Sequence, residues 1–160
     1  MGKIKTFEAK EFQIKLATLA DNAEKIAKAA LYDGAGVVAD AIREEIPNIP
    51  ISEEWGTPHN PKRGPSADEW LAINECLGIS EMKTENGKTD VSIGFGGYSS
   101  ITSNRWPKGI PAALVVRSVE RGTSFMYATP FVKRAAAKAR ATAEKAMLEA
   151  ADREIKKITK

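Results

Sequence analysis

Two side chains of this chain are of types that often carry chemistry, a single histidine and a single cysteine. His59 lies near Lys62 and Arg63 in a proline-rich stretch, and Cys76 lies within an expected short helix. A zinc site needs three or four converging ligands, and a nucleophilic cysteine needs a nearby base. We therefore interpret His59 as an exposed loop histidine and Cys76 as a free buried thiol. A lone cysteine also excludes an internal disulfide.

The remaining candidate patterns for catalysis or nucleotide binding are incomplete. Glu44-Glu45 and Glu53-Glu54 are neighbours in the sequence, and side by side they do not converge on one point. Gly94-x-Gly96-Gly97 lacks the GK[ST] ending of a phosphate loop and does not open a helix. The sequence thus predicts no enzyme, no cofactor and no metal, and it favours a protein that works through its surfaces. A small enzyme is the weakest alternative, which a deep pocket with converging titratable groups would support.

Basic residues are concentrated at the end of the chain. The 160 residues carry a net charge of +3, whereas nine Lys and Arg against four Asp and Glu give +5 between Phe131 and Lys160. One interpretation is contact with DNA phosphate or an acidic partner. The other is a solvated helix face with pairs such as Arg140–Glu144 and Glu149–Arg153. The candidate contact residues are Lys133, Arg134, Lys138 and Arg140, with Arg105 and Trp106 from a loop in which an aromatic ring between basic residues can stack on bases. The other interpretation of Trp106 is a side chain that packs at the edge of the expected hairpin.

These basic residues lie on what we expect to be the longest helix. Thr129 is placed to accept from the free N–H groups of the first turn, and Pro130 suits the first helical position. No Pro or Gly interrupts the sequence from there to Lys160. One apolar stripe is expected, at Val132, Ala136, Ala139, Ala143, Ala146/Met147 and Ala150. Because alanine is small, the stripe permits close approach of another backbone.

Several further helices are expected before it. The pattern predicts helix over Ala9–Leu19, and Asp21 with Glu24 predicts a capping box for a second helix that ends at Pro47. Gly34 and Gly36 each cost about 1 kcal/mol in a helix interior. They therefore indicate either close packing or a bend.

A second capping box marks a shorter helix. Ser66 and Glu69 predict its start, and Gly78 predicts its end. Another short helix is expected over Ala112–Arg121, begun by Pro111 and stopped by Gly122.

Strands are expected mainly in the middle of the chain. Asn86-Gly87 predicts a type I′ turn in a hairpin of Ile79–Glu85 with Lys88–Phe95. Val91, Ile93 and Phe95 alternate with small or polar residues, as in a strand with one buried face. Lys3–Phe7 is a further expected strand. The predicted fold class is α+β, with long helices packed on one face of a small antiparallel sheet that contains this hairpin.

Length and composition predict a single domain over residues 1–160. Five of the eight prolines fall in a long loop at about 47–65, and a loop of that length is usually functional or mobile. A second loop is expected over Tyr98–Pro111. Met1–Lys5 lacks an apolar run of signal-peptide length, and no stretch approaches about 18 uninterrupted apolar residues. We therefore expect no membrane association.

Several motifs resemble, in order and spacing, a family of phage structural proteins. They are Ala29-Ala30-Leu31-Tyr32-x-Gly34-Ala35-x-Val37-Val38-Ala39-Asp40, Leu77-Gly78-Ile79-Ser80, Asp90-Val91-x-Ile93-Gly94-Phe95 and Glu120-x-Gly122-Thr123-Ser124 followed by Pro130-Phe131. The last block, with the Ala-rich charged helix after it, is similar to the C-terminal signature of neck or tail-completion proteins of long-tailed phages. These are also described as minor tail or head–tail joining proteins. The resemblance covers most of the chain, although the Pro-rich loop departs from the shorter basic Thr-Gly loop of other branches.

This resemblance implies a virion protein assembled in the bacterial host cytoplasm. Copies of such proteins form a ring in the neck, around the channel for packaged DNA, and complete tails or join them to heads. The implied neighbours are the head connector or stopper and the tail terminator or tail tube proteins. Within the motif, the resemblance gives Gly122, Thr123 and Ser124 to a turn and Pro130-Phe131 to the start of the last helix. A sequence-independent DNA-binding protein that uses the basic C-terminal helix is the alternative.

Overall fold

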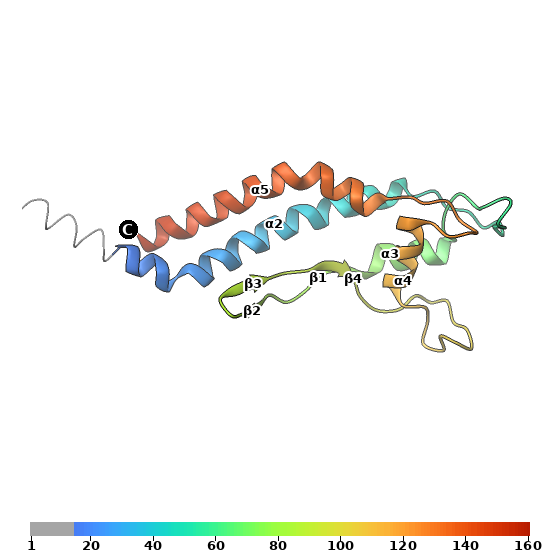
Figure 1. The fold of residues 1–160 in the computed structure, drawn as a ribbon, viewed down its shortest axis with the longest axis horizontal. Helices are drawn as coiled ribbons and strands as arrows, with labels where there is room; N and C mark the ends of the chain where they lie inside the picture. The colour runs from blue at the N-terminus through green and yellow to red at the C-terminus, as the bar shows by residue number, and fades with distance from the viewer. Residues whose placement is uncertain (1–14) are drawn as a thin grey trace, which may run out of the picture.

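Two long antiparallel helices form the spine of the molecule. The computed structural model describes residues 15–160, in which α2 (Ala23–Glu45) and α5 (Phe131–Ile158) lie side by side. A narrow β-hairpin runs along α2, and the short helices α3 and α4 lie near its base (Figure 1). The predicted α+β class is confirmed, and the helices pack on each other as well as on two small antiparallel sheets. The expected strand Lys3–Phe7 lies outside the described residues.

Small side chains let α2 and α5 approach closely. Ala39 of α2 and Ala139 and Ala143 of α5 are buried. At Gly34 an added Cβ would lie 2.5 Å from the Cγ atom of Met147, whereas at Gly36 nothing lies within 4 Å. Close packing is therefore the reason for a glycine at position 34.

The phase of the α5 stripe differs slightly from the prediction. Ala135 is fully buried and Ala136 is exposed, so the stripe begins one residue earlier than expected. Alanines occupy three successive positions here, 135–137, and only the direction of α2 decides which of them is covered. Of the helices described, none is long and apolar enough to cross a membrane.

The start of α2 differs from the expected capping box. Residues 15–21 are already helical, and Asn22 is the N-cap of α2 without a side-chain cap hydrogen bond. The side-chain amide of Asn22 donates instead to the carbonyl of Thr18 at 2.8 Å. The Asp21–Glu24 capping box was wrong, because the preceding helical turn occupies the space in which a free helix end was expected. Part of the expected helix Ala9–Leu19 falls outside the described residues.

The second capping box is confirmed. Ser66 accepts from the amide of Glu69, and the Glu69 side chain accepts from the amide of Ser66, at the start of α3 (Ala67–Cys76). The short 3-10 helix η1 (Ile46–Asn48), with Pro47 in its first turn, ends α2 as expected. The end of α3 differs, because Leu77 is already extended and begins a strand, so Gly78 does not act as a helix stop.

The predicted hairpin is present as two short ladders. β1 (Leu77–Ile79) pairs with β4 (Ile93–Phe95), and β2 (Lys83–Glu85) pairs with β3 (Lys88–Asp90), both antiparallel. The register slips by one residue between them, so the intervening segments form a bulge that bends the hairpin. Asn86 and Gly87 both have positive φ, at 52° and 74°, as a type I′ turn requires.

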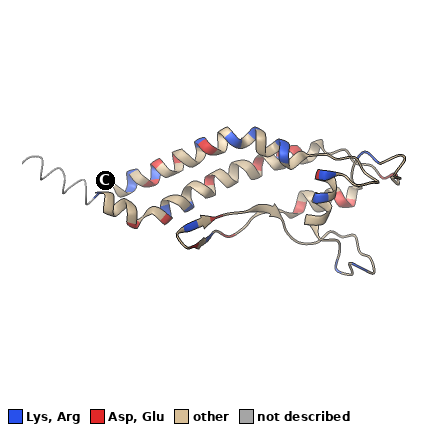
Figure 2. Ribbon diagram, in the orientation of Figure 1, with Lys and Arg blue, Asp and Glu red and all other residues tan. Residues whose placement is uncertain are grey.

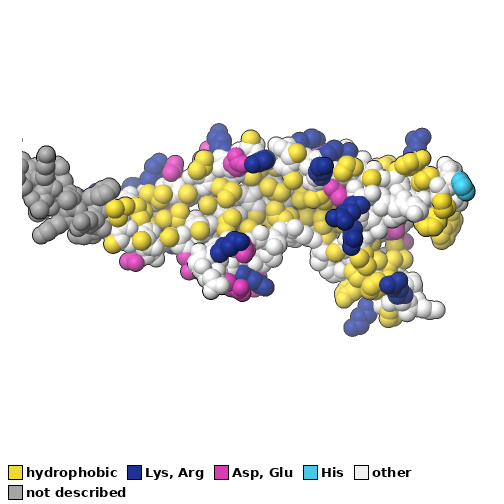
Figure 3. Space-filling view, viewed as in Figure 1, with side chains coloured by type: hydrophobic (Ala, Val, Ile, Leu, Met, Phe, Trp, Pro, Cys, Tyr) yellow, Lys and Arg dark blue, Asp and Glu magenta, His cyan; other side chains and the backbone are white. Residues whose placement is uncertain are grey.

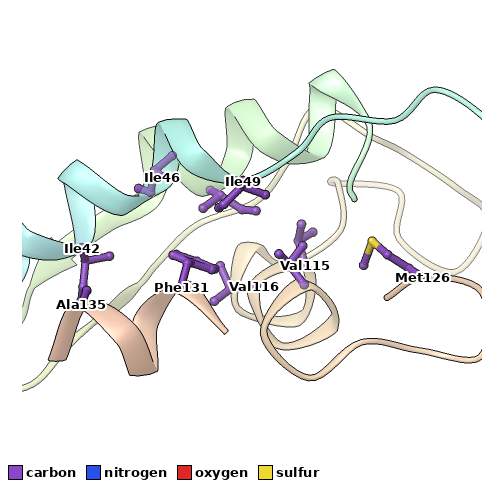
Figure 4. Close-up of a cluster of buried hydrophobic side chains, with 10 residues drawn as sticks. Ile42, Ile46, Ile49, Val115, Val116, Met126, Phe131 and Ala135 are labelled. Carbon is purple, nitrogen blue, oxygen red and sulfur yellow. The ribbon is translucent and has the colours of Figure 1, made fainter. Parts of the chain in front are cut away.

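The main core lies where α4 (Ala112–Arg121) and the start of α5 meet the end of α2. Phe131 is fully buried there, and its ring meets that of Phe95 edge-on at 6.1 Å between centroids. Figure 4 shows Phe131 beside Val116 and Ile42 beside Ala135. Large side chains at this end and alanines along the spine give the molecule its extended shape.

The cap of α5 comes from a residue that the sequence did not suggest. Both carboxylate oxygens of Glu120, at the end of α4, accept first-turn amides of α5, from Val132 and Lys133, at 2.9 Å each. Pro130 is the N-cap residue, one position before its expected place, and it has no side-chain cap bond. The predicted Thr129 cap was wrong. Two adjacent amides suit one bidentate carboxylate, whose negative charge also matches a helix N-terminus.

Candidate functional site

Three loops gather at one end of the molecule, which we call the loop end. It consists of residues 49–65, 98–111 and 122–130 and lies opposite the C-terminus (Figure 1). The proline-rich loop and the loop before α5 are neighbours in space although they are far apart in sequence. The loop end is therefore a composite surface that depends on the whole fold.

Backbone hydrogen bonds join two of these loops. The amide of Lys62 donates to the carbonyl of Phe125 at 2.8 Å, and the amide of Tyr127 donates to the carbonyl of Lys62 at 3.0 Å. The approach is close enough that a Cβ on Gly56 would lie 1.8 Å from the Phe125 carbonyl oxygen. Ser52 is tied to the other end of the same loop through the carbonyl of Pro65, at 2.9 Å. The prolines and these bonds together give the loop a defined shape.

This ordered surface presents large apolar side chains to solvent. Trp55 is 96% exposed, Phe125 53% and Tyr127 58%, and Ile51 beside them is 51% exposed. We call these four residues the aromatic face. Figure 3 shows hydrophobic side chains at this end, next to the single histidine. Exposed apolar side chains that are grouped on a fixed backbone are typical of a protein–protein contact.

Trp55 stands between two open pockets. The first, of about 780 Å³, is lined by residues 50–55, 60–63 and Tyr127. The second, of about 620 Å³, is lined by residues 52–56 together with Lys62, Ser66, Glu69, Ile101 and Phe125. Glu53 accepts from the amide of Ala67 at 2.7 Å, and Glu69 serves the capping box, so both carboxylates have structural partners.

The segment from Gly122 to Phe131 connects α4 to α5. Gly122 has φ 73°, and a Cβ there would lie 2.8 Å from the backbone nitrogen of Ala128. The amide of Phe125 donates to the Thr123 hydroxyl at 3.1 Å, whereas no hydrogen bond of the Ser124 side chain is found among residues 15–160. Together with the buried ring of Phe131, these contacts fix the direction in which Phe125 and Tyr127 project.

The basic C-terminal helix is largely neutralised by ion pairs. Arg134 and Lys138 both bind Glu45 of α2, and Arg153 binds Asp33 at 2.5 Å. Further pairs along the helix are Arg140–Glu144, Lys145–Glu149 and Lys157–Glu154. Figure 2 shows blue and red residues interspersed along α5. Among residues 15–160, no ion pair is found for Lys133.

Glu45 is a buried charged residue of α2 that binds two basic residues of α5. Its side chain is only 7% exposed and meets Arg134 Nε at 3.4 Å as well as the Lys138 ammonium group. The hydrogen bond from Lys138, with the charges of Lys138 and Arg134, holds the pKa of Glu45 below its usual value although burial acts in the opposite direction. Two of the predicted contact residues therefore have a structural role.

The remaining candidate residues do not converge on one site. Arg105 lies over the ring of Trp106, 5.6 Å from its centroid, in loop 98–111 and away from α5. His59 is exposed, as expected, whereas Cys76 is half-buried and not buried. No group of three or more potential metal-ligating residues occurs in the described part of the chain.

The aromatic face is the feature that sequence reasoning missed. A tryptophan inside a loop with five prolines was the available signal, because such a loop has little interior in which to bury it. The exposure of Phe125 and Tyr127 could not be predicted in the same way, since it depends on the backbone hydrogen bonds that their loop makes with Lys62. Comparison with protein-family models, with curated proteins and with solved structures gave no match to this chain.

Proposed function

We propose that this chain is a structural protein of the phage neck. Copies of it form a ring between the head connector or stopper and the tail terminator or tail tube, around the channel for packaged DNA. Its role there is tail completion or head–tail joining, in a virion assembled in the host cytoplasm, and it acts without catalysis. The resemblance of the motifs quoted above is the starting point of this proposal.

The observation that carries the proposal is the aromatic face at the loop end. Backbone bonds from Lys62 to Phe125 and Tyr127 hold these side chains out, and Trp55 is almost fully exposed. Aromatic residues that are held in place before binding lose little conformational freedom on contact, so they are effective in assembly. The long helical spine places this face at one tip of an elongated subunit, which suits contact with a neighbouring protein.

The alternative, DNA binding by the basic helix, has less support from the ion pairs. Six of the basic side chains of α5 have carboxylate partners within the chain, and Arg134 and Lys138 share a buried one. Phosphate contacts would have to compete with these pairs. Strong binding of free duplex that falls steeply with salt would favour this alternative, because each phosphate contact releases counterions.

Deletion of the gene from its phage or prophage tests the proposal. We expect negative-stain electron microscopy of the induced lysate to show DNA-filled heads beside unattached or malformed tails. Wild-type protein supplied in trans should restore joined, infectious particles. Normal particles from the deletion strain would refute the proposed function.

Two exposed aromatic residues give a matched pair for complementation. Trp55→Ala removes the most exposed residue of the aromatic face, whereas Tyr32→Ala removes a side chain that is 63% exposed on α2. We expect Trp55→Ala to fail in restoring joined particles and Tyr32→Ala to restore them. Both variants should unfold at the wild-type temperature, because neither side chain is in the core. If both variants restored joined particles equally, the loop end would have no special role in assembly.

A further inference from the structure

Two segments of the loop end, residues 49–61 and loop 98–111, carry opposite charge. Residues 49–61 contain Glu53 and Glu54 and no Lys or Arg. Loop 98–111 contains Arg105 and Lys108, and no Asp or Glu occurs anywhere from Val91 to Val119. Figure 2 shows blue and no red along loop 98–111. Loop 98–111 therefore carries charge of one sign. In loop 49–65 the two carboxylates come before Lys62, which pairs with Glu69 at 3.4 Å, and Arg63.

These charges are not neutralised within the chain. Among residues 15–160, no ion-pair partner is found for Glu54, Arg105 or Lys108, in contrast to most basic residues of α5. Figure 1 shows the two loops projecting in different directions, and no ion pair joins them among residues 15–160. Glu54 on one segment, and Arg105 and Lys108 on the other, can therefore form ion pairs with a second molecule.

Both loops also present aromatic side chains beside the charges. Trp55 directly follows Glu54, and loop 98–111 has Tyr98, which is 59% exposed, and Trp106 beneath Arg105. Figure 3 shows hydrophobic and basic side chains together on the lower projection at this end. Trp, Tyr and Arg are the residue types that most often dominate the energy of a protein–protein contact.

We infer that residues 49–61 of one copy dock against loop 98–111 of a second copy. Glu53 and Glu54 then face Arg105 and Lys108, and Trp55 packs into the contact beside Trp106. The chain itself provides both complementary halves, which is the reason for naming a second copy as the partner. Segments of like charge repel each other, so the charges disfavour the pairing of two identical segments.

This arrangement allows the same contact to repeat from one copy to the next. The acidic loop and the basic loop are different surfaces of one subunit, and a contact between different surfaces repeats from copy to copy until a ring closes. The inference deepens the proposed function, because it names the surfaces through which copies in a ring would touch. Its own test is self-association of the purified protein.

Charge reversal on each loop provides that test. The first variant combines Glu53→Gln with Glu54→Lys, because an amide side chain at position 53 keeps an oxygen that can accept from the amide of Ala67. The second is Arg105→Glu with Lys108→Glu. The control is Glu85→Lys, which repeats the charge reversal of position 54 at an exposed position of β2. Circular dichroism and thermal unfolding check that each variant is folded.

Sedimentation velocity and native mass spectrometry then measure association from about 10 µM to about 1 mM, at low salt. We expect wild type and the control to associate, and each loop variant alone to need at least about tenfold higher concentration, the effect of about 1.4 kcal/mol. An equal mixture of the two loop variants should recover association as mixed complexes, because each supplies the charge that the other lacks. Added salt should weaken all these contacts.

A wild-type protein that stays monomeric over this range overturns the inference. So does a mixture that fails to recover association, or a control that loses it equally. These results are independent of the lysate images. Unjoined heads and tails with a monomeric protein would leave the proposed function in place without this contact, and loop-dependent association with normal particles would leave the contact without the function.

Discussion

Two glycines in α2, two positions apart, should respond in opposite ways to the same substitution. At Gly36 no atom outside the local helix backbone lies within 4 Å of where a Cβ would be, so Gly36→Ala adds only helix propensity. At Gly34 the added Cβ would lie 2.5 Å from Cγ and 2.8 Å from Sδ of Met147, so the substitution also crowds α5. The pair isolates the close approach of the two long helices.

The expected magnitudes are separable by ordinary unfolding measurements. Replacing glycine by alanine in a helix interior stabilises by about 1 kcal/mol, which we expect in full at Gly36. Overpacking of a tight contact costs about 1–3 kcal/mol, so Gly34→Ala should range from neutral to roughly 2 kcal/mol less stable. For a chain of this length, 1 kcal/mol corresponds to about 2–4 °C in the unfolding temperature. The two variants should therefore differ clearly.

Urea unfolding followed by far-ultraviolet circular dichroism is the assay, with unchanged slopes as the check on two-state behaviour. In a Met147→Ala background the crowding atoms are gone, and Gly34→Ala should become stabilising by about 1 kcal/mol. The coupling between positions 34 and 147 should thus be about 1–3 kcal/mol. Equal stabilisation by Gly34→Ala and Gly36→Ala in the wild-type background would refute the close approach of α2 and α5.

Three further substitutions test single features of the fold. Gly122→Val should lower the unfolding temperature by several degrees and impair assembly, because φ of 73° and a contact at 2.8 Å both oppose a β-branched residue; unchanged melting would contradict this. Glu120→Ala should cost about 0.5–2 kcal/mol through loss of the α5 cap, and Glu120→Gln less, as measured by urea unfolding. Because the pKa of Glu45 is lowered in the folded state, its contribution to stability is present above the unfolded-state value of about 4.3 and is lost as the pH falls through the folded-state pKa. Glu45→Gln should therefore lower the urea midpoint at neutral pH and make its decline in acid shallower than that of wild type; parallel pH profiles would argue against the role of this carboxylate.

Sequence patterns predicted local structure well where the residues that interact are close together in the sequence. The Ser66–Glu69 capping box and the Asn86-Gly87 turn are examples, since each depends on residues within three positions. The same capping pattern at Asp21 was wrong, because it presumes a free helix end that residues 15–21 occupy. A local motif therefore predicts a helix start only when the preceding residues leave it free.

Features that depend on distant partners could not be predicted. The cap of α5 comes from Glu120, twelve positions before the first amide that it accepts. Glu45 looked like an ordinary surface carboxylate in an adjacent acidic pair, and only its contact with Lys138, 93 positions away, explains its burial. The exposure of the aromatic face likewise depends on bonds between loops on either side of the hairpin. Periodicity predicts which residues share a face of a helix, and the fold decides what that face meets.

The separation in sequence between α2 and α5 has a consequence for how the chain folds. Their contacts link residues 120 positions apart and more, as between Asp33 and Arg153 or between Lys25 and Glu154, so most of the chain must be synthesised before the spine can close. Contacts between distant residues slow folding, because a long loop has to be closed before any stabilisation is gained. Until then the alanine face of α2 stays open to solvent. We expect the hairpin and α3 to form first, and the closing of α5 onto α2 to be the late step that also orders the proline-rich loop.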